Sequence, residues 1–211
     1  MNRKICIFGA SGATGLVLTQ LFLESKQDVV AFVRSETAQH KLPLGVITKV
    51  GSLLNRGEVE CAITGCDVVV CAIGPRLSSP EAFCADATQN IIASMKAQGV
   101  RRLICLTGAM VGNYPHLSWF MRIMRSSYQK QQPSLAHDRS DQEKCVEASG
   151  LDWTLVKPPR LTNGKRRGGV RSGEALKVGM MSSISRSDLG CFLLEQADSQ
   201  EYIGKQVVVQ Y

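Results

Sequence analysis

The chain has 211 residues, of which 44% are hydrophobic and 20% are charged. This balance is typical of a globular domain and excludes disordered and collagen-like chains. Lysine and arginine number 25 against 18 aspartates and glutamates, which gives a net charge of +7. A positive protein suits an anionic partner, such as a phosphate-bearing cofactor, a nucleic acid or an anionic membrane, and composition alone does not choose among them.

The eight cysteines indicate reduced thiols rather than a secreted disulfide scaffold. Cys6, Cys71 and Cys105 lie inside apolar runs, and no two cysteines have C-x-x-C spacing. The apolar stretch at residues 5–8 is too short for the core of a signal peptide. No run approaches the roughly 18 apolar residues of a membrane span. We therefore expect a cytoplasmic protein without a membrane span.

Apolar runs that predict strands alternate along the chain with helical patterns. In chain order we expect a strand at 4–8, a helix at 13–25, strands at 29–33 and 46–50, a short helix near Glu58, a strand at 67–73, a helix at about 80–98 and a strand at 101–107. An insertion at about 108–136 interrupts the pattern. A helix at 137–149, a strand at 153–156, a glycine-rich basic stretch at 163–173, a helix after Ser187 and a strand at 206–210 follow. This order predicts an α/β fold with a Rossmann-like, doubly wound parallel sheet, in a single domain over residues 1–211.

A glycine-rich turn, GASGATG at residues 9–15, lies between the first predicted strand and the first predicted helix. Glycines permit a tight turn and a close approach of the backbone to a ligand. The free N–H groups and the positive end of the helix dipole then face a pyrophosphate. The turn therefore predicts a dinucleotide site, and a packing turn without a ligand is the alternative.

Arg34 follows the second predicted strand, where a chain that prefers NAD usually has an acidic residue. A guanidinium at this place pairs with the 2′-phosphate of NADP, so the sequence predicts NADP(H) as cofactor. Glu36 lies nearby, and a solvated arginine is the alternative. Two further turns, at residues 51–53 and 72–76, are expected to line the same crevice or to be ordinary loops.

Six motifs are spread along nearly the whole chain: IFGASGATG at 7–15, VRS at 33–35, AIGPR at 72–76, NIIASMKAQGVRRLICLTGA at 90–109, SGLDWTLVKPP at 149–159 and ISRSDLGCFLL at 184–194. Together they resemble the atypical short-chain dehydrogenase/reductase (SDR) family. Within it, the likeness is to the NAD(P)-binding NmrA-like group, which includes flavin and biliverdin reductases. This combination is specific for the family and much less so for the substrate.

The resemblance implies roles for individual residues. It assigns the pyrophosphate to Gly9, Ser11, Gly12, Ala13, Thr14 and Gly15, and the 2′-phosphate to Arg34. Ser52 and Leu53 would hold the adenine, and the dinucleotide site would continue along Ile73, Gly74 and Arg76. The nicotinamide would be flanked by Lys157, Pro158, Pro159 and Arg160. In similar reductases a serine after the fifth strand lies beside the hydride path. Here that position holds Gly108, after Thr107, and these two are the candidate catalytic positions.

The chain departs from the wider family in lacking its Tyr-x-x-x-Lys pair, in which the tyrosine protonates a carbonyl oxygen. None of the four tyrosines has lysine four residues further on, and the positions of the pair hold Leu135 and Arg139. A conjugated acceptor, such as a flavin or a linear tetrapyrrole, spreads the incoming charge and takes its proton from water. The leading hypothesis is therefore NADPH-dependent hydride transfer to such a small-molecule acceptor. The alternatives are a non-catalytic NADP(H)-binding redox sensor that acts through a protein partner, and an enzyme acting on another metabolite.

The insertion at about 108–136 is expected to determine the substrate. Its helical stripe of Leu117, Phe120, Met121 and Met124, beside Trp119, predicts an amphipathic lid against the acceptor. A helix that simply packs on the domain and attachment to a membrane surface are the alternatives. No acidic residue occurs between Asp86 and Asp138, which favours an anionic acceptor.

The remaining basic and histidine residues predict neither nucleic-acid binding nor a metal site. The cluster of Lys165, Arg166, Arg167 and Arg171 lacks interleaved aromatic residues. We interpret it first as a solvated loop and second as a region that attracts anionic substrate. The three histidines show no metal-ligand spacing, so no metal is expected.

Overall fold

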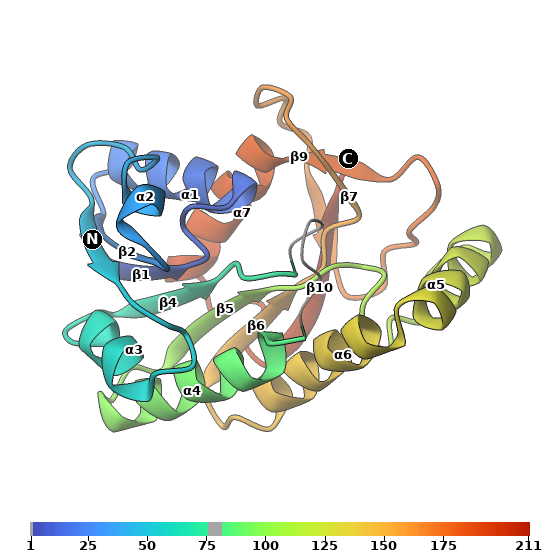
Figure 1. Cartoon of the computed structure of the whole chain (residues 1–211). Coiled ribbons are helices and arrows are strands. Elements are labelled where there is room, and N and C mark those ends of the chain that lie inside the picture. Colours follow the sequence, from blue (N-terminus) through green and yellow to red (C-terminus); the bar gives the residue numbers. More distant parts are fainter. Residues whose placement is uncertain (1, 76–81) are drawn as a thin grey trace.

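The computed structural model describes residues 2–75 and 82–211. Its centre is an eight-stranded sheet in the order β3-β2-β1-β4-β5-β6-β10-β8 (Figure 1). The strands are β1 (Lys4–Phe8), β2 (Asp28–Val33), β3 (Ile47–Val50), β4 (Val68–Cys71), β5 (Arg102–Leu106), β6 (Asp152–Val156), β8 (Arg171–Gly173) and β10 (Lys205–Gln210). Only β8 is antiparallel to its neighbour within this sheet. The predicted Rossmann-like α/β fold is confirmed.

Helices cover both faces of the sheet. On one face lie α1 (Ala13–Glu24) and α7 (Arg186–Asp198), and on the other lie α3 (Arg56–Ile63), α4 (Cys84–Ala97) and α6 (Pro133–Glu147), as Figure 1 shows. Strand residues alternate between these layers: Ile5 and Ile7 pack toward α1 and α7, whereas Cys6 and Phe8 pack toward α3 and α4. Because both faces are covered, central strands such as β4 are apolar throughout.

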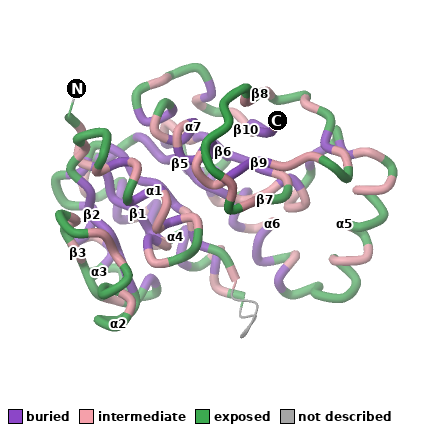
Figure 2. The backbone as a smooth tube through the Cα atoms, turned by 90° about the horizontal axis from the view of Figure 1, so that it is seen from above, coloured by how far each residue is buried: buried purple, intermediate pink, exposed green. Residues whose placement is uncertain are grey.

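The insertion forms α5 (Trp119–Gln131), which contains no buried residue. Figure 2 shows buried segments concentrated in the strands and none along α5. A small separate cluster, made of Ala109, Tyr114, Leu117, Val178 and Val208, joins the start of the insertion to β10. The segment that precedes helix α5 is therefore packed against the domain, whereas the helix itself is not buried.

Some elements differ from the sequence prediction. Helix α6 begins at Pro133 rather than near residue 137, since proline is well suited to the first helical turn. The short strands β7 (Arg160–Thr162) and β9 (Ser183–Ser185) form a separate parallel pair that was not predicted. The expected start of the helix near residue 80 lies outside the described residues. The short helix α2 (Glu36–Gln39) follows β2.

No helix in the described ranges 2–75 and 82–211 is long and apolar enough to cross a membrane.

Candidate functional site

The glycine turn joins β1 to α1 at the carboxyl edge of the sheet. Gly9 has a φ of +82°, and a Cβ there would lie 2.6 Å from the Ala72 carbonyl oxygen. A Cβ on Gly15 would lie 2.1 Å from the Gly9 carbonyl oxygen. Only glycine fits at these two positions, because any side chain would collide with backbone.

The N-terminus of α1 is open to an anion. Gly12 is the residue before the helix, no described side chain caps it, and the first turn carries no acidic residue. The free N–H groups around Ala13 and Thr14 and the positive end of the helix dipole therefore favour a phosphate. The structure thus brings the predicted pyrophosphate residues together in a cradle that fits this group.

Arg186 adds a cation to the cradle and was not singled out from the sequence. Its Nε donates to Thr14 Oγ1 over 3.3 Å, and its Nη1 donates to Asn163 Oδ1 over 2.5 Å. Arg186 begins α7, and 172 residues separate it from Thr14 along the chain. No local pattern in a single sequence indicates a contact over that distance.

The residues assigned to the adenosine half lie at the ends of the adjacent strands β2 and β3. Arg34 is exposed directly after β2. After β3, the Ser52 N–H donates to Glu58 Oε2 over 2.7 Å, and the Leu53 carbonyl accepts from Asn90 Nδ2 over 3.0 Å. These hydrogen bonds fix the loop at residues 51–53. The sequence marked Glu58 only as part of a helix, whereas the structure shows that its carboxylate holds this loop.

Arg139, on α6, links the ends of β4 and β5. Its guanidinium donates to the Ile73 carbonyl over 3.0 Å, to the Leu106 carbonyl over 3.4 Å and to Gln142 Oε1 over 2.5 Å. Only 6% of Arg139 is exposed, and Leu135 is also buried. The two positions assigned to the Tyr-Lys pair thus hold a buried apolar residue and a buried arginine that donates three hydrogen bonds. Gly74 follows Ile73, and Arg76 lies outside the described residues.

The candidate catalytic positions follow β5. The Thr107 N–H donates to the Val156 carbonyl over 3.0 Å, while its buried Oγ1 has no hydrogen-bond partner among the described residues. Gly108 has space around it, since a Cβ there would lie 3.9 Å from its nearest neighbours. Buried hydroxyls are normally hydrogen-bonded, so the orphaned Thr107 Oγ1 fits a site that a cofactor or substrate completes.

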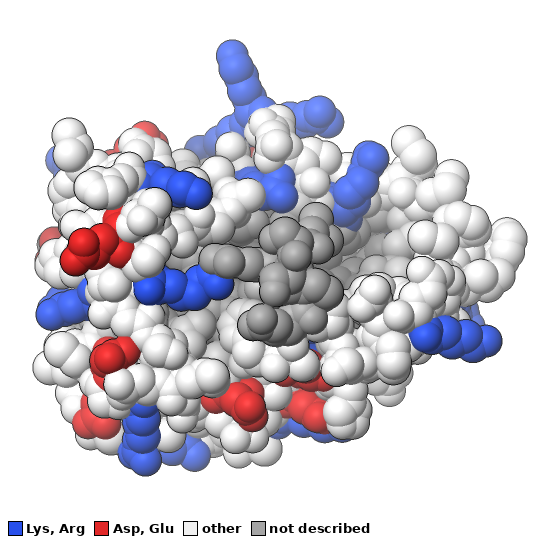
Figure 3. Space-filling view, viewed as in Figure 1, with Lys and Arg blue, Asp and Glu red and all other residues white. Residues whose placement is uncertain are grey.

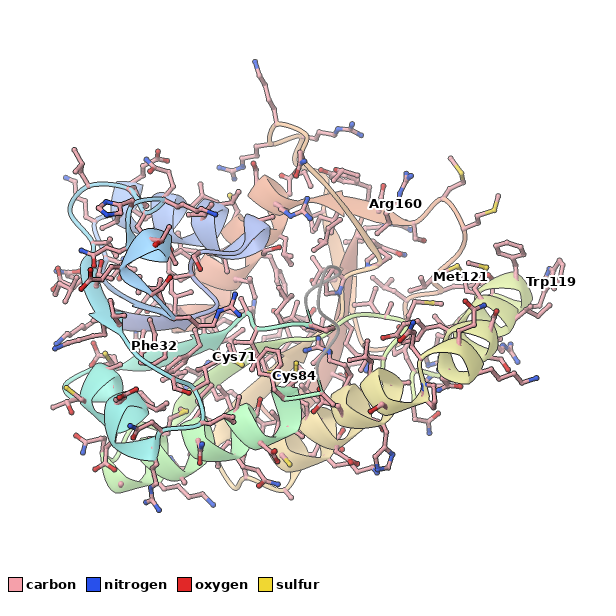
Figure 4. All side chains as sticks on the ribbon, viewed as in Figure 1. Phe32, Cys71, Cys84, Trp119, Met121 and Arg160 are labelled. Carbon is pink, nitrogen blue, oxygen red and sulfur yellow. The ribbon has the colours of Figure 1, made fainter. Side chains whose placement is uncertain are left out.

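The residues assigned to the nicotinamide follow β6 but differ in exposure. Arg160 is exposed at the start of β7, where Figure 4 labels it, and Pro159 is half-buried. Pro158 is buried, and the Lys157 side chain is completely inaccessible to solvent. Burial lowers the pKa of Lys157, and the attraction of the Glu143 carboxylate opposes that shift. Any contact between Lys157 and a cofactor is therefore left to its backbone.

Asp188, on α7, anchors the basic loop. Its carboxylate accepts hydrogen bonds from the backbone of Arg167 and Gly168 and from the hydroxyls of Ser185 and Tyr211. Burial alone would raise the pKa of Asp188, but these donors hold it below its usual value. The loop side chains of Lys165, Arg166 and Arg167 are exposed. Behind the loop lies a cavity of about 280 Å³ that shares no lining residue with the glycine turn.

Comparisons with known proteins agree with this geometry. The model of a family described as NAD(P)H-binding matches residues 9–200. The protein called an uncharacterized sugar epimerase, YhfK of Bacillus subtilis, is 24% identical over 204 residues, which cover 93% of this chain and 89% of that protein.

Two solved structures share the fold at low sequence identity. ChuY, described as an anaerobillin reductase from Escherichia coli, superposes with a TM-score of 0.80 at 19% identity, covering 98% of this chain and 96% of ChuY. A short-chain dehydrogenase/reductase from Veillonella parvula in complex with NADP also gives a TM-score of 0.80, at 17% identity over 100% of this chain and 95% of that one.

Proposed function

Because the chain belongs to the family of NAD(P)H-binding proteins, we propose that it is an NADPH-dependent reductase of a conjugated acceptor, a flavin or a biliverdin-like tetrapyrrole. The observation that carries this proposal is the pair of positions where related enzymes hold their acid. Leu135 is buried, and the buried Arg139 donates to the Ile73 and Leu106 carbonyls. An acceptor that spreads negative charge over a π-system does not need a protein acid.

The residues that would hold the cofactor lie along one edge of the sheet. The N–H groups of the glycine turn would bind the pyrophosphate, with Arg186 as a second positive partner. Arg34 would pair with the 2′-phosphate, and the loop at residues 51–53 would contact the adenine. When bound, the reduced nicotinamide supplies a hydride. Thr107 and Gly108 would face it from the end of β5.

The insertion supports an anionic acceptor. No acidic residue occurs between Asp86 and Asp138, while α5 contributes Arg122, Arg125 and Lys130. Figure 3 shows basic but no acidic side chains at the end of this face where α5 lies. Flavin phosphates and tetrapyrrole propionates are both negative, so this surface would attract them. The description of ChuY as an anaerobillin reductase supports the same acceptor class.

We propose that the reaction takes place in the cytoplasm. All eight cysteines are free, and Cys6, Cys71 and Cys105 are buried in the strands. Free thiols persist in a reducing compartment, which also maintains reduced cofactor.

The proposal is tested by following NADPH oxidation with FMN, riboflavin, biliverdin, quinones and a set of simple ketones. General acid catalysis contributes roughly 10²- to 10⁴-fold, so conjugated acceptors should be reduced faster than ketones by a factor of that order. Brisk ketone reduction would contradict the mechanism. Tight NADPH binding without turnover of any acceptor would favour the alternative, a redox sensor that acts through a protein partner.

A further inference from the structure

We propose that the buried Lys157–Glu143 ion pair is a positioning device that holds the turn at residues 108–112 in place beside the reaction centre. This inference rests on the proposed reductase function, because that turn begins at the candidate catalytic position Gly108.

The pair is entirely enclosed. Lys157 Nζ lies 2.6 Å from Glu143 Oε1 and 2.7 Å from Oε2. The exposed fractions of the two side chains are 0% and 4%. Lys157 comes directly after β6, and Glu143 belongs to α6. The ion pair therefore links a strand end to the helix that covers it.

The third hydrogen bond of the ammonium group reaches the turn. Lys157 Nζ donates to the Val111 carbonyl oxygen over 2.9 Å. The Val111 N–H in turn donates to the Gly108 carbonyl over 3.0 Å, which closes the turn. The Ala109 N–H donates to the Pro158 carbonyl over 3.0 Å. Two consecutive residues after β6 thus hold the turn, one through its side chain and one through its backbone.

The turn also rests directly on the Glu143 carboxylate. Gly112 has a φ of +61°, and a Cβ there would lie only 1.9 Å from Glu143 Oε2. From α5, Arg125 Nη1 donates to the Gly112 and Tyr114 carbonyls, over 3.4 Å and 3.2 Å. Glycine at position 112 lets the backbone approach the carboxylate closely. The position of the carboxylate therefore sets the position of the turn.

Stability alone does not account for this arrangement. The desolvation of two buried charges offsets much of their attraction, and replacing such a pair with apolar residues of similar volume is often neutral or stabilising. An apolar pair would fill the same space, but it has no donor for the Val111 carbonyl. Holding that carbonyl is the contribution that requires an ammonium group.

The test replaces both charges at once, in the double variant Lys157→Met/Glu143→Met. We expect its unfolding midpoint and its NADPH affinity to stay close to those of the wild type. We expect kcat/KM for FMN to fall about 10- to 100-fold, because small errors in orientation are costly in catalysis. Amide hydrogen exchange within residues 109–112 should accelerate. The single variant Lys157→Met leaves Glu143 buried and unpaired, and we expect it to be far less stable than the double variant.

The matched control removes an exposed ion pair from the same helix, in Lys144→Met/Asp141→Asn. These two side chains lie 2.9 Å apart with exposed fractions of 66% and 35%. The control should keep both activity and exchange rates. A folded Lys157→Met/Glu143→Met variant with wild-type kcat/KM and wild-type exchange would overturn the inference. If the wild type reduced no acceptor, the proposed function would fail, while the exchange measurement would still decide whether the pair holds the turn.

Discussion

Arg34 is the residue at which the cofactor preference can be tested most directly. It is exposed directly after β2, and the adjacent Ser35 accepts a hydrogen bond from the Ala38 N–H at the start of α2. The backbone at this strand end is thereby fixed. A 2′-phosphate beside Arg34 would gain a charge-assisted hydrogen bond, whereas the 2′-hydroxyl of NADH would not.

We predict that Arg34→Ala weakens NADPH binding roughly 10- to 150-fold and leaves NADH binding nearly unchanged. A hydrogen bond to a charged group contributes about 1.5 to 3 kcal/mol, which corresponds to this loss. Titration calorimetry with both cofactors measures the effect. Lys41→Ala, which removes another exposed cation after α2, is the control and should change neither affinity. Equal losses for NADPH and NADH would show that Arg34 does not contact the 2′-phosphate.

The sequence predicted which residues reach the carboxyl edge of the sheet better than it predicted where their side chains lie. Lys157 was expected to flank the nicotinamide, yet its side chain pairs with Glu143 inside the protein. The charged side chain of a residue after a strand is buried only where the helix that covers the strand supplies an oppositely charged partner. The sequence did not show that Glu143 faces the sheet, because four of the six buried residues on α6 are polar or charged, so its buried face shows no hydrophobic stripe.

At the scale of the elements, the apolar residues predicted to form one stripe in the insertion differ in how far helix α5 buries them. Met121 packs against the cluster around Tyr114 and Leu117, whereas Trp119 is 72% exposed and Met124 is 48% exposed. Figure 4 labels Trp119 and Met121 at the start of this helix. The packing alternative therefore holds for Met121. The half-buried Phe120, whose ring is edge-on to Trp119, remains the candidate wall for an acceptor.

We predict that Phe120→Ala raises the acceptor's KM roughly 2- to 10-fold, because an aromatic contact contributes about 0.5 to 1.5 kcal/mol. Steady-state kinetics at saturating NADPH measures this change. Met121→Ala should instead lower the free energy of unfolding and leave KM unchanged. Ile123→Ala, at a residue 57% exposed on the same helix, is the control and should alter neither quantity. A raised KM in Met121→Ala with none in Phe120→Ala would reverse these assignments.

Most elements show a clear hydrophobic pattern and were predicted from the sequence. The short strands, which show no such pattern, were not predicted. Strand β1, with its apolar run at residues 5–8, has the bounds that the sequence predicts, Lys4–Phe8. The strands β7 and β9 have three residues each and are defined by their pairing with one another across the basic loop. A run of three residues is too short to show alternation, so only the folded chain reveals the pair.

At the scale of the whole molecule, charge is distributed unevenly along the chain. The net charge is +7, yet all acidic residues lie outside the stretch between Asp86 and Asp138. That stretch includes β5, the turn at residues 108–112 and α5. An excess of positive charge accelerates the arrival of anions and is screened by salt.

We therefore predict that salt weakens the use of anionic acceptors and spares neutral ones. Between low and high ionic strength, kcat/KM for FMN should fall by roughly tenfold, because electrostatic steering accelerates association by at least this factor. Riboflavin carries the same ring system without the phosphate, so its kcat/KM should hardly change. Both acceptors are assayed at saturating NADPH, since the cofactor is itself anionic. Parallel losses for FMN and riboflavin would mean that salt acts on the protein or its cofactor rather than on acceptor steering.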